Sequence, residues 1–172
     1  MSAAGFRVRV AAVADLADIV KMERSIAEAP HWGEAEYVAI VAADRRTDVA
    51  VRRCLMVAET DGRLVGFAVG KVIGFEPSGS NGVAELESVA VDPAARRRGV
   101  GRALCKAVID WCRGQGAETV ELEVRAAGSD GAVALYGGLG FVAAGRRRGY
   151  YREPTEDALL MKLELAGGDR GQ

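Results

Sequence analysis

The chain has 172 residues, of which 49% are hydrophobic, 27% are charged and 6% are aromatic. This length and balance fit one compact globular domain and exclude a disordered or fibrous chain. The 23 Lys and Arg residues against 24 Asp and Glu residues leave a formal charge of -1. The overall charge therefore gives no reason to expect direct binding to nucleic acid or to an anionic membrane.

Cysteine and histidine are scarce in the sequence. Cys54, Cys105 and Cys112 are an odd number, and His31 is the only histidine. A disulfide framework and a zinc site of Cys and His ligands are therefore not expected, and we predict no metal. No apolar run reaches the roughly 18 residues of a membrane-spanning helix, and arginines interrupt the start of the chain, where a secretion signal would be apolar. These observations favour a cytoplasmic protein.

The first part of the chain predicts a strand, two helices and a hairpin. Residues 6–10 alternate between apolar and other side chains, as in a half-buried strand. Asp15 can cap a helix whose apolar residues recur at three- and four-residue steps, and residues 37–41 mark a second amphipathic helix. Two strand-like runs, 54–59 and 64–73, flank an Asp-Gly pair, which is typical of an antiparallel hairpin.

The second part predicts an alternation of strands and helices after an exposed connection at residues 74–82. We expect strands at 84–91, 119–124, 141–144 and 158–165 and helices at 102–113 and 131–139. Alternation along the first of these strands is expected to place on one face Glu85, Glu87, Val89 and Val91. Residues 1–165 thus predict a single α/β domain, a mixed sheet of about seven strands with roughly four helices on both faces, and residues 166–172 predict a disordered tail.

The most informative segment runs from Arg96 to Arg102 and reads Arg-Arg-Arg-Gly-Val-Gly-Arg. A glycine-rich turn between a strand and a helix presents backbone N–H groups at the positive end of the helix, and Gly99 and Gly101 let a phosphate approach closely. The turn lacks the lysine and hydroxyl residue of a nucleoside-triphosphate loop and the third glycine of a dinucleotide fingerprint. It predicts a diphosphate cradle without metal, and the alternative is a solvated arginine run before an ordinary helix.

Later segments give this turn a context. They read Leu122-Glu123-Val124-Arg125, Ala134-Leu135-Tyr136 and Leu139-Gly140-Phe141. With Arg96, Gly99 and Gly101 in the turn, the chain resembles the GNAT superfamily of acetyl-CoA-dependent N-acetyltransferases over nearly its whole length. Within the superfamily it is most similar to the bacterial ribosomal-protein-alanine N-acetyltransferases, which acetylate a protein N-terminus. That narrower likeness depends on Arg147-Arg148-Gly149-Tyr150-Tyr151, Glu156-Asp157-Ala158 and Met161.

The resemblance implies acetyl-CoA as the co-substrate, with the acyl-pantetheine arm against a strand backbone and the diphosphate in the turn. The residues that it implies for this binding are Val89, Ala90, Val91, Arg97, Arg98, Gly99, Val100, Gly101 and Arg102. Ser129 or Asp130 would replace an Asn that the family usually has, in a turn that is one residue longer here. The resemblance also implies that Glu123 is the general base and Tyr136 the general acid.

The implied reaction forms an amide from a thioester without a covalent enzyme intermediate. Loss of a proton from an α-amino group, with a pKa of about 8, costs roughly 1 kcal/mol near neutral pH, and from a lysine roughly 4 kcal/mol. A carboxylate acting through water can suffice for an N-terminus. The residues alone would place Glu121 and Glu123 together on a solvated strand face, and Glu85 and Glu87 are rival bases. Tyr136 alone could be a core residue, and a hydrogen bond to the thiolate suits it better than full proton transfer.

Aromatic residues are candidates for acceptor binding. Trp32 lies in the corner between the first two expected helices, and Tyr150 and Tyr151 lie in the expected connection before the last strand, where relatives line a peptide groove. Ordinary loop packing is the alternative. The functions that compete are acetylation of a protein N-terminus such as that of a ribosomal protein, acetylation of a small amine, and a non-catalytic coenzyme A sensor. The sequence does not decide between a monomer and a homodimer.

Overall fold

The computed structural model describes residues 5–26, 32–42, 51–74 and 82–165. Most of the expected connection at 74–82, the expected tail at 166–172 and His31 lie outside the described residues. The strands are β1 (Arg7–Val10), β2 (Val51–Thr60), β3 (Arg63–Ile73), β4 (Gly82–Val91), β5 (Ala117–Arg125), β6 (Val142–Tyr151) and β7 (Glu156–Glu164). The α-helices are α1 (Leu16–Ser25), α2 (Glu34–Ala42), α3 (Val100–Gly114) and α4 (Asp130–Gly138).

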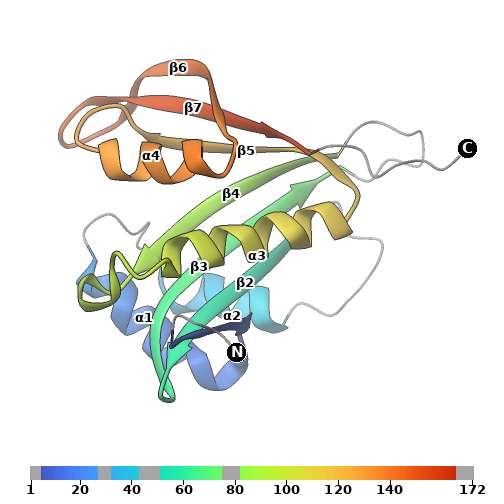
Figure 1. Ribbon diagram of the computed structural model, residues 1–172, viewed down its shortest axis with the longest axis vertical. Coiled ribbons are helices and arrows are strands. Elements are labelled where there is room, and N and C mark those ends of the chain that lie inside the picture. Colours follow the sequence, from blue (N-terminus) through green and yellow to red (C-terminus); the bar gives the residue numbers. More distant parts are fainter. Residues whose placement is uncertain (1–4, 27–31, 43–50, 75–81, 166–172) are drawn as a thin grey trace, which may run out of the picture.

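The described strands form one seven-stranded sheet in the order β1-β2-β3-β4-β5-β7-β6. Each neighbouring pair is antiparallel except β4 and β5, which are parallel. One buried cluster joins the sheet to α3, with side chains of α4 packed against it, and a second joins the sheet to α1 and α2. In the ribbon, α3 lies on one face of the sheet and α1 and α2 lie on the other (Figure 1). The predicted mixed α/β sheet with helices on both faces is therefore confirmed. None of the described helices is long and apolar enough to cross a bilayer.

Hydrophobic periodicity explains why these elements pack as they do. In β2, Met56 and Ala58 belong to the cluster with α3, whereas Leu55 and Val57 belong to the cluster with α1 and α2. A strand covered on both faces reads as a continuous apolar run because neither face meets water. Asp15 stands at the N-cap of α1, but its carboxylate accepts hydrogen bonds from Arg9 and from the N–H of Ala12 instead of capping an α1 amide.

The cysteines of α3 are core residues. Cys105 and Cys112 have no exposed surface, and both belong to the cluster that joins α3 to the sheet. Burial raises the pKa of each thiol to about 12, because the charged thiolate is poorly solvated there. A thiol with such a pKa is inert at neutral pH. The prediction that these two residues are small core side chains and not nucleophiles is confirmed.

Helix α3 packs closely on β3 at Gly70. A Cβ at this position would lie 2.5 Å from Cγ1 of Val108 and 3.1 Å from Sγ of Cys54. We expect Gly70→Ala to lower the free energy of unfolding by roughly 2–3 kcal/mol, because overpacking forces buried groups to move. Urea denaturation measures this change. Gly114→Ala, whose Cβ would meet nothing within 4 Å, is the control and should not destabilise the protein. An unchanged unfolding free energy for Gly70→Ala would contradict the close approach.

Strand β4 contains a bulge at Glu87. Val69 of β3 pairs with Ser88, whereas the next residue, Gly70, pairs with Leu86. Glu87 is therefore an additional residue on β4 that has no counterpart on β3. Such a bulge reverses the alternation of side chains on the strand beyond it, because the side-chain period is two.

The reversal is visible in the packing of β4. Ala84 and Leu86, before the bulge, belong to the cluster with α3. After the bulge, Ala90 belongs to the cluster with α1 and α2, and Val89 and Val91 pack against the cluster with α3. Uniform alternation was the wrong assumption, because the inserted residue exchanges the two faces. The prediction that Glu85, Glu87, Val89 and Val91 share one face of the strand is therefore wrong.

Strand β6 is longer than its sequence predicts. The expected strand ended at residue 144, but β6 runs to Tyr151 and pairs with β7, including Arg147 with Ala158 and Tyr151 with Glu156. Tyr150 and Tyr151 therefore lie at the end of a strand and not in a connection. The glycines of this segment, Gly145 and Gly149, have little strand propensity, and pairing with β7 overrides that preference.

Candidate active site

The parallel strands β4 and β5 pair over only the first part of their length. The pairing runs from Gly82 with Ala117 to Glu85 with Glu121, and beyond it the two strands diverge (Figure 1). A cavity of about 770 Å³, here called the β4–β5 cavity, opens at this divergence. Its walls are the second half of β4, the turn before α3, the end of β5, the start of α4 and Tyr151.

The turn before α3 has the backbone conformation of an anion site. Arg97 has a φ of 64° and Gly99 a φ of 82°, so two residues of the turn are left-handed. The first hydrogen bond into α3 is donated by the N–H of Ala103 to the carbonyl of Gly99, at 3.0 Å. The N–H groups of residues 100–102 therefore have no partner within the helix, and they lie at its positive end. The predicted cradle thus forms one wall of the β4–β5 cavity.

The structure places most of the predicted acetyl-CoA residues on the walls of the β4–β5 cavity. Those that line it are Val89, Ala90, Val91, Arg97, Gly99, Val100, Gly101, Arg102 and Ser129. Arg98 and Asp130 do not line it. Ser129 is the N-cap residue of α4, and Asp130 is the first residue of that helix. Of the two candidates to replace the family's Asn, Ser129 is therefore the one that faces the cavity.

Glu123 of β5 lines the β4–β5 cavity and contacts two residues of β6. Its Oε1 lies 2.9 Å from Nε of Arg147, and 22% of its side chain is exposed. A hydrogen bond with Glu123 also raises the pKa of Tyr150, because the carboxylate stabilises the protonated phenol. The Arg147 guanidinium lies 5.7 Å from the centroid of the Tyr150 ring. Two side chains from the end of β6 therefore hold the carboxylate of Glu123.

Sequence reasoning missed this partnership. Arg147 appeared as one of several arginines in an expected connection, and its contact with Glu123 depends on the pairing of β6 with β7 and of β7 with β5. Arg125, which lies 4.3 Å from the centroid of the Tyr151 ring and 2.9 Å from Glu156, was missed for the same reason. Only a correct assignment of β6 as far as Tyr151 would have indicated these contacts.

Tyr136 of α4 lines the same cavity. Its ring lies 5.9 Å from that of Phe141, at an interplanar angle of 65°, and packs against the cluster with α3. Burial raises the pKa of Tyr136 well above its usual value of 10, because the phenolate would be poorly solvated. The hydroxyl therefore stays protonated at neutral pH and can donate a hydrogen bond. Within the described residues it has no hydrogen-bond partner.

The two rival carboxylates of β4 contact cations. Nζ of Lys71 lies 2.7 Å from Glu85 and 3.2 Å from Glu87. Arg53 donates two hydrogen bonds to Glu87, at 2.9 Å and 3.3 Å. Glu87 lines the β4–β5 cavity, whereas Glu85 does not. The structure thus brings Glu123, Tyr136 and Glu87 to one cavity and leaves Glu85 outside it.

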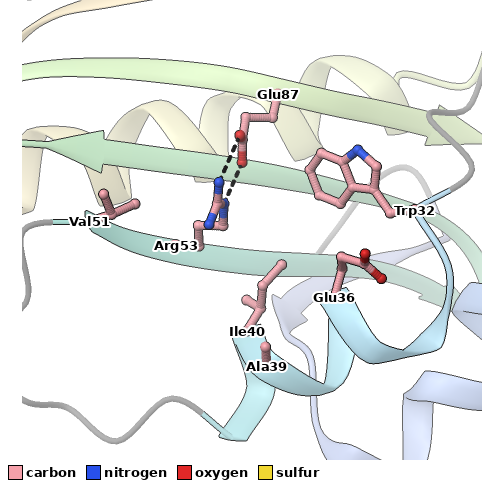
Figure 2. A pocket seen from close by; sticks show the side chains of 7 residues that line it. All are labelled: Trp32, Glu36, Ala39, Ile40, Val51, Arg53 and Glu87. Atoms are coloured by element: carbon pink, nitrogen blue, oxygen red, sulfur yellow. Dashed lines mark hydrogen bonds and ion pairs between the residues drawn. The ribbon is translucent and has the colours of Figure 1, made fainter.

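A second cavity, here called the α2 cavity, adjoins the first at Glu87. It has a volume of about 490 Å³ and is lined by Trp32, Glu36, Ala39, Ile40, Val51, Arg53 and Glu87 (Figure 2). Of the aromatic residues predicted to bind the acceptor, Trp32 lines the α2 cavity and Tyr151 lines the β4–β5 cavity. Tyr150 is 50% exposed and lines neither cavity.

Comparisons with known proteins place this arrangement in a family. The profile of the acetyltransferase (GNAT) family matches residues 16–141. The [ribosomal protein bS18]-alanine N-acetyltransferase of Escherichia coli strain K12 is 40% identical over 108 residues, which cover 62% of this chain and 68% of that protein. The crystal structure of the ribosomal-protein-S18-alanine N-acetyltransferase from Escherichia coli has a TM-score of 0.73 and 29% identity, over 97% of this chain and 99% of that one.

A more distant structure has the same fold. Arabidopsis thaliana NAA60 in complex with acetyl-CoA has a TM-score of 0.76 and 20% identity, over 93% of this chain and 98% of that one. The family profile spans the cradle, the end of β5 and Tyr136, which are the parts that meet at the β4–β5 cavity. This chain belongs to the GNAT acetyltransferase family.

Proposed function

We propose that the protein transfers the acetyl group of acetyl-CoA to the α-amino group of a protein N-terminus, of the ribosomal-protein-alanine type. The observation that carries the proposal is the β4–β5 cavity, where an anion cradle, a carboxylate and a protonated phenol meet. The similarity to the bS18-alanine N-acetyltransferase of Escherichia coli supports the acceptor class. The chemistry of the cavity fits acetyl-CoA. The backbone N–H groups of the cradle can bind its diphosphate, and the edge of β4 that β5 leaves unpaired can bind its extended pantetheine arm.

We assign the binding of acetyl-CoA to two elements. The N–H groups at the start of α3, with Arg97 and Arg102, bind the diphosphate. The backbone of Val89, Ala90 and Val91 binds the pantetheine arm in place of the strand neighbour that β4 loses where β5 diverges. Ser129 takes the position of the family's Asn. Arg98 and Asp130 rank below these residues as contacts of acetyl-CoA, because they do not line the cavity.

Bound acetyl-CoA supplies a thioester carbonyl carbon to an acceptor nitrogen. Glu123 takes the proton that the amine loses, directly or through water, so that the nitrogen lone pair can form the new C–N bond. Tyr136 donates a hydrogen bond to the sulfur as the C–S bond breaks and negative charge develops there. Glu85 ranks below Glu123 as a candidate base because it does not line the cavity, and Glu87 ranks below it because it contacts two basic side chains, Arg53 and Lys71, whereas Glu123 contacts Arg147. The acceptor groove is formed by Trp32, Tyr150 and Tyr151.

One experiment tests the proposed acceptor. The protein is incubated with acetyl-CoA and a panel of alanine-initiated peptides, N-terminally blocked lysine peptides, polyamines and aminosugars, and the products are analysed by tandem mass spectrometry. We expect one acetyl group on the first residue of the alanine-initiated peptides. Acetylation of polyamines or aminosugars alone would replace the proposal with a small-amine acetyltransferase. No turnover with retained binding of acetyl-CoA would indicate a coenzyme A sensor.

Arg102 provides a test of the cradle. Its side chain is exposed at the N-terminus of α3 and lines the β4–β5 cavity. We expect Arg102→Ala to raise the Kd for acetyl-CoA about fivefold at low ionic strength, since an exposed ion pair contributes up to about 1 kcal/mol. At about 1 M salt the difference should disappear, because charges are then screened beyond about 3 Å.

Isothermal titration calorimetry measures both Kd values. Arg113→Ala is the matched control, because Arg113 lies at the other end of the same helix and pairs with Asp110 at 2.9 Å. A Kd that is the same for Arg102→Ala and Arg113→Ala at low salt would remove Arg102 from the diphosphate site.

We further propose that residues 1–165 act as one domain in the cytoplasm. A reducing compartment suits a protein whose described cysteines are all free thiols. We propose no direct contact with nucleic acid or membrane, and the protein acts as a monomer or a homodimer.

A further inference from the structure

Helix α1 carries a buried carboxylate that the proposed chemistry does not use. Glu23 is 1% exposed and lies in the last turn of α1. The neighbouring residues Ile19 and Ile26 belong to the apolar cluster that joins α1 and α2 to the sheet. A carboxylate in such surroundings is costly unless hydrogen bonds replace its lost hydration. The burial of Glu23 therefore depends on the groups that donate hydrogen bonds to it.

Glu23 accepts three hydrogen bonds from the far side of the α1–α2 connection. The backbone N–H of Trp32 donates to Oε1, and the backbone N–H of Gly33 donates to Oε2 at 3.3 Å. The hydroxyl of Tyr37, in the first turn of α2, donates to Oε1 at 3.0 Å. One side chain of α1 thus fixes the backbone that enters α2. Hydrogen bonds to a charged acceptor are among the stronger ones in proteins.

This contact determines where Trp32 lies. The backbone of Trp32 is held by Glu23, and its indole ring lies 5.8 Å from the ring of Tyr37. In that position Trp32 forms one wall of the α2 cavity, opposite the ion pair of Arg53 and Glu87 (Figure 2). Ile26, at the other end of the connection, lines the β4–β5 cavity. The two ends of the α1–α2 connection therefore border two adjoining cavities.

We propose that Glu23 is a positioning residue for the acceptor, holding Trp32 as the wall of the α2 cavity, which receives the acceptor chain beyond its first residue. The inference rests on the proposed function. An amine at Glu123 occupies the β4–β5 cavity, and the rest of the acceptor must leave by a route that adjoins it. The α2 cavity adjoins it at Glu87 and is partly apolar, through Ala39, Ile40 and Val51.

The test compares a long and a short acceptor. The long one is an alanine-initiated peptide of about six residues, which spans roughly 20 Å when extended, and the short one is alaninamide. We expect Glu23→Gln to raise KM for the long peptide roughly tenfold, because the amide offers one acceptor oxygen where the carboxylate offers two. The kcat with that peptide and KM for acetyl-CoA should stay within about twofold, and kcat/KM for alaninamide should not change.

A general loss of stability must be separated from this effect. Ile19→Val is the matched control, because Ile19 is fully buried on the same helix and its side chain forms no hydrogen bond to the α1–α2 connection. It should lower the melting temperature and leave the ratio of the two kcat/KM values unchanged. Tyr37→Phe serves if Glu23→Gln fails to fold, since it removes one of the three donors. We expect it to raise KM for the long peptide about threefold without affecting alaninamide.

A double-mutant cycle with Trp32→Ala completes the test. If Glu23 acts through Trp32, Glu23→Gln should have no further effect on KM for the long peptide once the indole is removed. Additive effects would overturn the inference, as would equal losses with the long peptide and alaninamide. Either result would leave N-terminal acetylation intact. The absence of N-terminal acetylation by the unmodified protein would instead remove the proposed function on which the inference rests.

Discussion

Replacing Glu123 with Gln is expected to lower kcat/KM for an alanine-initiated peptide by about 10²- to 10⁴-fold, the usual contribution of a positioned general base. The amide keeps the size of the side chain and can still contact Arg147, which lies 2.9 Å from the carboxylate. It cannot accept the proton of the acceptor amine. Steady-state kinetics with a thiol assay for released coenzyme A measures the loss.

The loss of activity in Glu123→Gln is expected to depend on pH through the protonation of the acceptor amine. An α-amino group has a pKa of about 8, so below that pH the acceptor must lose a proton before it reacts, and above it most molecules are already neutral. The difference between the unmodified protein and Glu123→Gln should therefore narrow as the pH rises above about 8. A defect of the same size at all pH values would assign Glu123 to binding and not to proton transfer.

Two matched variants identify the base. Glu121 lies on the same strand, two residues before Glu123, and pairs in register with Lys162. Glu121→Gln should leave kcat/KM within about threefold, as is usual for a surface change away from the reacting atoms. Glu87→Gln tests the rival carboxylate that also lines the β4–β5 cavity. A loss confined to Glu87→Gln would transfer the role of base from β5 to β4.

Replacing Tyr136 with Phe is expected to lower kcat by about 10²-fold and leave the fold unchanged. The ring contact with Phe141 is retained, and in the described part of the chain the hydroxyl forms no hydrogen bond whose loss would destabilise the protein. Burial raises the pKa of Tyr136, so full proton transfer to a thiolate of pKa about 8.5 is unfavourable. A hydrogen bond to the developing thiolate remains favourable, and the variant removes it.

Three measurements distinguish this role from packing. Thermal unfolding and the Kd for acetyl-CoA should match those of the unmodified protein, and single-turnover acetyl transfer should be slow. A tyrosine that only packs would tolerate the change, so an unaltered kcat would contradict the role in leaving-group stabilisation. A fall in both melting temperature and acetyl-CoA affinity would assign Tyr136 to the structure of the cavity wall.

Features set by local sequence were predicted correctly. The Asp61-Gly62 pair predicts a hairpin turn, and both residues have positive φ values, 49° and 76°, between β2 and β3. The cradle was recognised for the same reason, because its glycines and helix start are consecutive in the chain. Glu123 and Tyr136 were chosen as candidate catalytic residues through the resemblance to a family, and their roles remain proposals. Their positions within a strand and a helix would not by themselves distinguish them from other half-buried residues.

Features that depend on distant pairing were not predicted. The bulge at Glu87 exists because of the register between β3 and β4, and the ion pair of Arg147 with Glu123 exists because β7 lies between β5 and β6. Glu23 looks like an ordinary charged residue on an amphipathic helix, yet its hydrogen-bond partners begin nine residues further on. A sequence pattern carries no information on such contacts until the neighbouring elements are placed.

The open edge of the sheet has a consequence for self-association. β6 is the terminal strand in the order of the described sheet, and three consecutive arginines, Arg146, Arg147 and Arg148, lie along its exposed length. If two molecules joined edge to edge in antiparallel fashion through this segment, guanidinium groups of one would face those of the other. Like charges directly opposite on paired strands repel. Although Arg146 also pairs with Asp157 and Arg147 with Glu123, these arginines therefore discourage two molecules from joining through the backbone of β6.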